Sequence, residues 1–338
     1  MTHEFKELID AGIIWKQQGI NAVLATVVSL KGSSYRRPGV RMLLSEEGNW
    51  VGAVSGGCVE KEVLFQSKSV FETHESKLMS YDGRFRLGCE GILYILLEPL
   101  SLSHEFIYAF EEVLNSRSTF NCESYFKIEG ETLIGLGSQL IINDRSYSLT
   151  QCVEVSNMDE FDCFSQSFSP IFQLYIFGAE HDAVQLCKMA TQIGWQVHII
   201  APPDEAKSLE YFKGAISLNT PIYENIDTSK FDNETAVVLM THSFNKDIQY
   251  LMALKDVNPC YMGLLGPSHR RERIFSKLVE YLPDVEPEFF ESIYGPMGVD
   301  IGAESASEIA LSILAEILSV IRNKQPIFLK DKKGHIHE

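Results

Sequence analysis

The chain has 338 residues, of which 45% are hydrophobic and 22% charged, and its formal net charge is −17. Length and composition of this kind are typical of a globular protein with two domains. The acidic excess argues against broad contact with a nucleic-acid backbone, and no apolar run approaches the ~20 residues of a membrane helix. Without a signal-peptide pattern, the chain is expected to be cytoplasmic, with no nucleic-acid or membrane partner.

The seven cysteines are spread along the chain, with no CxxC pair and no clustered spacing of cysteine and histidine. Such spacing is atypical of a disulfide framework or a zinc site. We therefore expect reduced thiols, no structural zinc and no iron-sulfur cluster.

The first half of the sequence predicts helices mixed with antiparallel strands. Apolar periodicity and turn residues predict a helix over 4–19, strands over 21–30, 41–45, 50–54 and 92–100, helices over 59–72 and 104–116, and alternating strands within 121–135 and 146–155. We expect an N-terminal α+β domain over 1–165 with a mixed or antiparallel sheet. The polar segment 156–170, which ends in proline, is the expected linker.

From residue 171 the pattern changes to apolar strands that alternate with helices. Strands are expected over 171–178, 195–201, 235–242 and 260–266, each followed by a helix. This alternation is typical of a parallel sheet wrapped by helices. Ser305 and Glu308 have the spacing of a capping box at the start of the last helix. The fold class is therefore α/β, with a Rossmann-like, doubly wound domain over 171–323 and a polar tail over 324–338.

A run of four cations free of carboxylates stands out in so acidic a chain: Lys31, Arg36, Arg37 and Arg41. Guanidinium groups can clamp a phosphate or the edge of a pterin through planar, multidentate donors. Charge runs are more often a solvated face, but here Pro38 and Gly39 shape a turn, and solubility does not require cations on this protein. The run therefore predicts a surface that holds an anion.

The loop that follows, GAVSGGC over 52–58, has the glycine spacing of half a phosphate loop. Cys58 and Val59 stand where lysine and serine or threonine would be needed, so it is not a nucleotide-hydrolysing loop. Paired glycines at a helix start still allow N–H groups to converge on an anion, which makes Ser55, Gly56 and Gly57 candidates. The same helix start favours a Cys58 thiolate that could ligate a soft metal or exchange sulfur. A glycine turn with a buried, inert cysteine remains the alternative.

The dinucleotide fingerprint is incomplete in the second half. Gly178 and Ala183 occupy its first and third positions, but Glu180 holds the second, where backbone should approach a pyrophosphate. Binding of NAD(P) is therefore doubtful, although the fold signal is strong. His242 ends a strand at the edge where ligands bind in open sheets, with Asp247 on the next helix. These two residues are the catalytic candidates if the protein is an enzyme, and a structural histidine is the alternative.

Together these stretches resemble the XdhC/CoxI family of accessory proteins of xanthine dehydrogenase. The resemblance rests on ATVVSLKGSSYRRPGVRML and GAVSGGCVEKEV in the first half, and on LYIFGAEHD, LMTHSFNKD, YMGLLGPSHRRERI and GVDIGAESASEIALSILAEI in the second. Two departures from the family pattern are Glu180 in Gly-Ala-Glu-His and Glu90 in Gly-Cys-Glu-Gly, which weaken the transfer of nucleotide binding and of a role for Cys89. Judged from its residues alone, without the resemblance, the loop that contains Cys89 is interpreted as structural.

The resemblance implies a chaperone that binds molybdenum cofactor, supports its sulfuration and passes it to apo-xanthine dehydrogenase in purine catabolism. A cysteine desulfurase or sulfurtransferase is the implied second partner, and a homodimer is expected. Cys58 is the candidate contact to molybdenum. The candidate cofactor-binding residues are Ser33, Ser34, Arg36, Arg37, Arg41, Ser55, Gly56, Gly57, Cys58, Cys89, Gly178, Glu180, His181 and His242.

Two rival functions remain open. The chain could be an NAD(P)-dependent oxidoreductase that uses the Rossmann cleft with His242 as acid or base. It could also be a purely structural component of the dehydrogenase that never touches the cofactor. A cofactor chaperone is expected rather than an enzyme, even where relatives carry the name of a dehydrogenase component.

Overall fold

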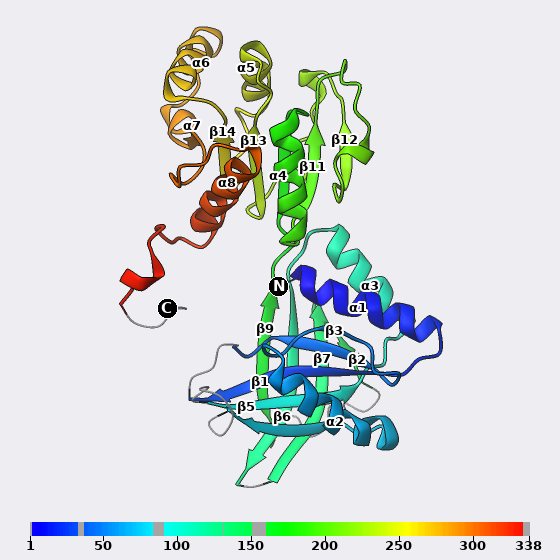
Figure 1. Cartoon of the computed structure of the whole chain (residues 1–338). Coiled ribbons are helices and arrows are strands. Elements are labelled where there is room, and N and C mark those ends of the chain that lie inside the picture. Colours follow the sequence, from blue (N-terminus) through cyan, green and yellow to red (C-terminus); the bar gives the residue numbers. More distant parts are fainter. Residues whose placement is uncertain (1, 33–36, 84–90, 131, 151–159, 334–338) are drawn as a thin grey trace. The chain divides into compact units, whose positions relative to one another are not determined.

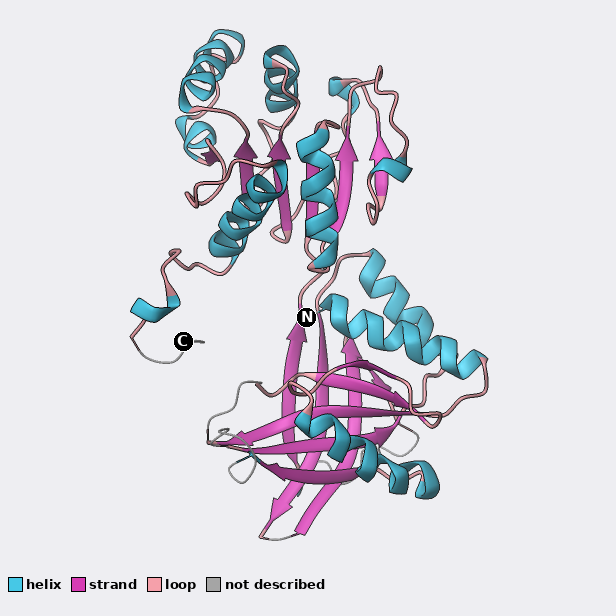
Figure 2. Ribbon diagram, viewed as in Figure 1, coloured by secondary structure: helices cyan, strands magenta, loops and turns pink. Residues whose placement is uncertain are grey.

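The computed structural model describes residues 2–32, 37–83, 91–130, 132–150 and 160–333. The chain divides into two compact units, Met1–Pro170 and Ile171–Glu338 (Figure 1). Figure 2 shows that strands dominate the first unit, whereas helices flank a central sheet in the second.

Two antiparallel sheets form the N-terminal unit. The first has the strand order β3-β2-β1-β5-β4 and the second has the order β8-β7-β6-β9. The strands of the first sheet are β1 (Ala22–Lys31), β2 (Arg41–Ser45), β3 (Trp50–Gly52), β4 (Lys77–Asp82) and β5 (Ile92–Pro99). Those of the second are β6 (Phe120–Glu129), β7 (Thr132–Ile142), β8 (Arg145–Ser148) and β9 (Asp162–Phe168).

The central strands of the first sheet, β1, β2 and β5, are largely buried on both faces. Successive side chains of a strand point to opposite faces, so Val23 and Met42 pack with Val63 of α2 (Cys58–Thr73). On the opposite face, Leu24 and Leu43 join a core to which α1 (Thr2–Gln17), α3 (His104–Asn115) and the second sheet contribute. Arg41 lies two residues before Leu43 and shares its face, which directs this cation into the core between the sheets.

The predicted linker over 156–170 is wrong in its second half. Asp162–Phe168 forms β9, which pairs with β6 from Phe120↔Phe168 to Phe126↔Asp162. Most side chains of β9 are polar because one face of the strand is exposed. A sequence of this composition is equally typical of a loop, which is why the strand was predicted as part of the linker. The strand β4 was not expected from the sequence either.

The C-terminal unit is a parallel sheet with the order β12-β11-β10-β13-β14-β15. Its strands are β10 (Gln173–Phe177), β11 (Gln196–Ile200), β12 (Ser217–Asn219), β13 (Thr235–Leu239), β14 (Tyr261–Leu264) and β15 (Ile293–Tyr294). The helices α4 (His181–Gln192) and α8 (Ala306–Ile321) pack on one face. The helices α5 (Phe244–Ala253) and α6 (Ser268–Tyr281) pack on the other. The expected α/β, doubly wound architecture is confirmed.

One predicted helix of this unit is wrong. Between β11 and β13 the chain forms 3₁₀ turns over Leu209–Tyr211 and Tyr223–Asn225 on either side of the edge strand β12. Pro202, Pro203 and Gly214 interrupt any longer helix in this stretch. The short helix α7 (Pro287–Glu291) and β15 were not expected either.

The capping box of the last helix is confirmed. The Glu308 amide donates to Ser305 Oγ at 3.3 Å, and the Ser305 amide donates to the Glu308 carboxylate at 2.8 Å. In the predicted polar tail, Leu329–Asp331 forms a 3₁₀ turn, and 334–338 lie outside the described residues.

Candidate functional site

A pocket of about 280 Å³ opens in the N-terminal unit. Its walls come from α1, the turn over 37–40, β2, β3 and β9. Two of the arginines singled out from the sequence meet there: Arg37 is exposed, whereas Arg41 is 7% exposed. The pocket therefore joins the cationic run to the strand that leads into the glycine loop.

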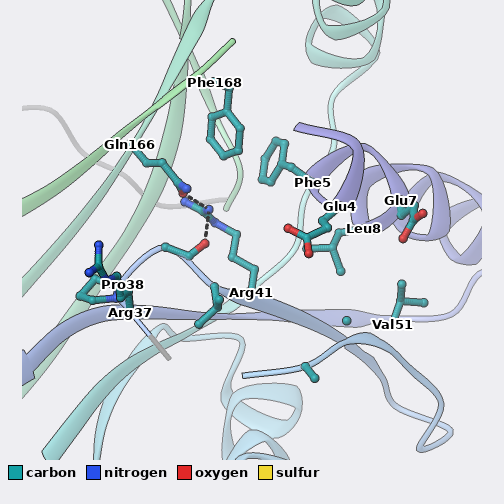
Figure 3. Close-up of a pocket in the computed structure, with 14 residues that line it drawn as sticks. Glu4, Phe5, Glu7, Leu8, Arg37, Pro38, Arg41, Val51, Gln166 and Phe168 are labelled. Carbon is teal, nitrogen blue, oxygen red and sulfur yellow. Dashed lines mark hydrogen bonds between the residues drawn. The ribbon is translucent and has the colours of Figure 1, made fainter. Parts of the chain in front are cut away.

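Arg41 is held rigidly in the wall of this pocket. Its Nη1 donates to the Gly39 carbonyl at 2.9 Å and to Gln166 Oε1 on β9. Its guanidinium carbon lies 5.3 Å from the ring centroid of Phe5 and 5.5 Å from that of Phe168, which is within cation–π range. Figure 3 shows the guanidinium next to Gln166, beside these two rings. Its Nε and Nη2 are buried and have no hydrogen-bond partner among the described residues, so two donors remain for an acceptor.

Two glycines allow the chain to approach Arg41 closely. Gly39 has a φ of +100°, and a Cβ there would lie 2.9 Å from the Gln166 amide. Gly52 has a φ of +78°, and a Cβ there would lie 2.7 Å from the Arg41 carbonyl oxygen. A side chain at either position would move the groups that hold the guanidinium, because both backbones lie in the left-handed region.

A buried carboxyl lies in the layer between the sheets. The side chain of Glu98 is fully buried and accepts hydrogen bonds from the Ser138 amide at 2.7 Å and the Ser138 hydroxyl at 2.6 Å. Burial raises the pKa of Glu98 to about 7, although these hydrogen bonds and the charge of Arg41 oppose the shift. Burial likewise raises the pKa of the Cys122 thiol, again against the charge of Arg41. Sequence reasoning missed Glu98, but a lone carboxylate within the apolar strand ILYILLEPL was a usable signal.

The glycine loop is occupied by a carboxylate of the same chain. α2 begins at Cys58, with Gly57 as its N-cap. The Glu60 carboxylate accepts hydrogen bonds from the Ser55 amide at 2.6 Å, the Ser55 hydroxyl at 2.6 Å and the Gly57 amide at 2.9 Å. Partial burial opposes ionisation of Glu60, but these donors outweigh it and lower its pKa. The backbone geometry suits an anion as expected, yet the anion at these two amides is internal.

The Rossmann-like unit has the glycine backbone of a nucleotide site, but a carboxylate stands where the phosphates would bind. Gly178 follows β10 with a φ of +132°, and a Cβ there would lie 2.6 Å from the Met240 carbonyl oxygen. Glu180 is the exposed N-cap of α4, followed by the exposed His181. β10 lies between β11 and β13, so Gly178 marks the switch point of the sheet. A carboxylate at this helix start opposes a pyrophosphate.

The two catalytic candidates do not act as a pair. His242 Nε2 lies 3.0 Å from Asp182 Oδ2 on α4, and the His242 side chain is 53% exposed. Asp247 is buried and accepts hydrogen bonds from Thr241 Oγ1 at 2.6 Å and Arg270 Nη1 at 2.5 Å. Asp247 therefore belongs to a buried ion pair with Arg270, whereas His242 contacts Asp182.

Several predicted site residues lie outside what the structure describes: Ser33, Ser34, Arg36, Cys89 and the side chain of Cys58. Across the described ranges, no group of three or more histidine, cysteine, aspartate or glutamate residues could hold a metal ion. Among the helices of these same ranges, none is long and apolar enough to cross a membrane.

Fold and site together define a two-domain protein with an arginine-lined pocket in an antiparallel unit and a Rossmann-like unit whose fingerprint is broken. In comparisons with known families, residues 15–82 match the XdhC and CoxI family and residues 174–317 match the XdhC Rossmann domain. A Bacillus subtilis (strain 168) protein, named as a probable xanthine dehydrogenase subunit, is 30% identical over 315 residues, covering 88% of this chain and 92% of that protein. The chain belongs to the XdhC and CoxI family, as its motifs predicted.

Two further relatives extend the comparison. The molybdenum cofactor insertion chaperone PaoD of Escherichia coli (strain K12) is 25% identical over 325 residues, covering 95% of this chain and 90% of that protein. A crystal structure described as a xanthine dehydrogenase from Bacillus halodurans superposes with a TM-score of 0.74 at 24% identity, covering 94% of this chain and 96% of that one. This superposition shows a shared fold over both units.

Proposed function

We propose that this protein binds molybdenum cofactor, supports its sulfuration and assists its insertion into xanthine dehydrogenase. The observation that carries the proposal is the match over almost the whole chain to a relative named as a molybdenum cofactor insertion chaperone. The name of the B. subtilis relative supports xanthine dehydrogenase as the recipient. Purine catabolism, a cytoplasmic location and a homodimer belong to the same proposal.

The residues of the N-terminal pocket fit one part of this cofactor, which is a pterin dithiolene that carries a phosphate. Arg41 is a buried cation with two nitrogen atoms that have no partner among the described residues, and phosphate oxygens are strong acceptors for guanidinium donors. Arg37 adds a second cation to the wall of the pocket. In this proposal the two arginines hold the phosphate, with Arg36, Ser33 and Ser34 of the preceding segment as further candidates.

Cys58 is proposed to contact molybdenum or its sulfur ligand. Cys58 is the first residue of α2, where the positive end of the helix dipole favours a thiolate. Gly52 and Ala53, in the pocket wall, precede Cys58 by only a few residues. The sulfur would come from a cysteine desulfurase or sulfurtransferase as second partner. Gly56 and Cys89 remain proposed contacts, and Ser55 and Gly57 join them in this proposal only when they release Glu60.

A transfer assay tests this function. Purified protein, loaded with molybdenum cofactor, is mixed with apo-xanthine dehydrogenase and a sulfur donor, and the activity gained is measured against cofactor supplied alone. We expect faster activation with the loaded protein, and little acceleration from Cys58→Ala. Equal activation with and without the protein would reject the function, whereas full acceleration by Cys58→Ala would reject only the assigned thiol.

The oxidoreductase alternative keeps one supporting observation, the contact between His242 and Asp182 at the switch point of the sheet. A histidine held by a carboxylate can transfer protons. Glu180 at the start of α4 argues against a dinucleotide in this crevice. NAD(P) binding therefore stays doubtful, and Gly178, Glu180, His181 and His242 stay proposed as cofactor-binding residues of this unit.

A further inference from the structure

Arg41 carries a charge that the described part of the chain does not neutralise by an ion pair. Within these ranges its guanidinium donates to the neutral oxygens of Gly39 and Gln166. A candidate carboxyl in the same core, Glu98, directs its oxygens at Ser138 instead. A guanidinium that is 7% exposed and forms no salt bridge with the described residues is costly. An anion that enters the pocket would remove this cost.

The rest of the pocket is apolar in part, and two aromatic rings lie beside Arg41 in its wall. The rings of Phe5 and Phe168 lie 4.9 Å apart, centroid to centroid, and both lie against Arg41. Leu8 and Val51 add further apolar surface. The volume of about 280 Å³ is near the lower end of small-molecule sites, so a single ring system with a short substituent fills it.

The charges of the pocket limit the ligand further. Arg37 adds a positive charge, but Glu4 and Glu7 of α1 add two carboxylates. Figure 3 shows Glu4 and Phe5 projecting from α1 toward Arg41. A second anionic group near the glutamates would be repelled. A ligand with one anionic end at Arg41 and N–H donors toward Glu7 suits both charges.

We propose that this pocket is a binding site for a phosphate monoester of a flat, nitrogen-containing ring, with the phosphate on Arg41 and the ring beside Phe5 and Phe168. That this ester is the phosphate arm of molybdopterin rests on the proposed function. The site itself rests only on the geometry of Arg41 and its neighbours.

Calorimetric titration of the full chain with phenyl phosphate, inorganic phosphate and phenol tests the site. We expect phenyl phosphate to bind at least tenfold more tightly than inorganic phosphate, because the ring adds apolar contact. Phenol should not bind measurably. Arg41→Met should weaken phenyl phosphate binding at least tenfold, and Arg145→Met, an exposed arginine on β8, should leave it unchanged. Equal affinity of wild type and Arg41→Met would overturn the proposal.

A second variant keeps the test valid if Arg41→Met fails to fold. Glu4→Gln removes a like charge from the wall and should tighten phenyl phosphate binding about threefold; unchanged or weaker binding contradicts the charge argument. A crystal structure with phenyl phosphate should place the phosphate at Arg41, and a phosphate elsewhere would overturn the site. Loss of phenyl phosphate binding in Arg41→Met with undiminished binding of molybdenum cofactor would retain the site and reject its link to the cofactor.

Discussion

Glu98 and Ser138, on strands of opposite sheets, share two hydrogen bonds of 2.7 and 2.6 Å in the core of the N-terminal unit. The Ser138 hydroxyl also lies 2.7 Å from that of Ser124. The carboxyl thus joins two sheets through a polar contact within an apolar layer. Such a contact favours one arrangement of the two sheets, whose residues also hold Arg41.

The pKa of about 7 at Glu98 predicts a pH-dependent stability. Since the pKa in the folded state exceeds the ordinary 4.5, the folded protein binds the proton more tightly than the unfolded chain does. The contribution of Glu98 to the free energy of unfolding is therefore greatest below pH 4.5. It is lost as the pH rises through 7, by about 3 kcal/mol in total. Denaturant unfolding at about pH 5 and about pH 8 measures this loss.

Glu98→Gln is the matched control for this prediction. Glutamine stays neutral, so the fall in stability between about pH 5 and about pH 8 should shrink by about 3 kcal/mol relative to wild type. Comparison of the two proteins cancels the opposite trend of carboxyls with lowered pKa, such as Glu60 and Glu308. Identical pH profiles for wild type and variant would contradict the assignment.

Asp247 is predicted to stabilise the fold through its ion pair with Arg270. Asp247→Ala leaves Arg270 without its partner in a largely buried position and should lower the free energy of unfolding by about 3 kcal/mol. His242→Gln removes only a contact of an exposed side chain and should cost less than about 1 kcal/mol. Chemical denaturation measures the loss of stability in both variants. A larger loss in His242→Gln than in Asp247→Ala would contradict the structural role of Asp247.

Gly178 is predicted to be irreplaceable for steric reasons. Gly178→Ala would place a Cβ 2.6 Å from the Met240 carbonyl oxygen on a left-handed backbone, at a cost of at least about 2 kcal/mol. Gly302→Ala is the control, because its φ is also positive, at +70°, but no atom lies within 4 Å of its Cβ. Thermal melts should show the larger loss for Gly178→Ala, and equal losses would refute the steric argument.

Glu180 is predicted to exclude dinucleotides from the Rossmann-like unit. Wild type should bind NAD(H) and NADP(H) only weakly, and Glu180→Gly should tighten binding at least tenfold by removing a side chain and a like charge. Fluorescence titration with the reduced nucleotides measures both affinities. Tight binding by wild type would favour the oxidoreductase alternative.

Much of the fold was predictable because its signals are local. The apolar strands of the second half and the capping box at Ser305 depend on neighbours in the sequence. The strand β9 was missed because its role depends on pairing with β6, about forty residues earlier in the chain. The stretch between β11 and β13 was misread because its edge strand, β12, has only three residues and leaves almost no periodic signal.

The candidate site was predictable in part. Arg37 and Arg41 were visible as a break in an acidic chain, and the structure brings both to one pocket. No local signal indicated that Gln166 and Phe168 would contact Arg41, because both lie on a strand far along the chain. Such contacts depend on how the two sheets pack, and this packing cannot be predicted from neighbouring residues in the sequence.

The proposed cofactor site is tested most sharply by the affinity of the purified full-length protein for molybdenum cofactor, with Arg41→Met compared with Arg145→Met. We predict that wild type and Arg145→Met bind the cofactor equally well, and that Arg41→Met binds it at least tenfold more weakly while remaining folded by circular dichroism. Cofactor binding that is absent in wild type, or undiminished in a folded Arg41→Met, would contradict the proposal.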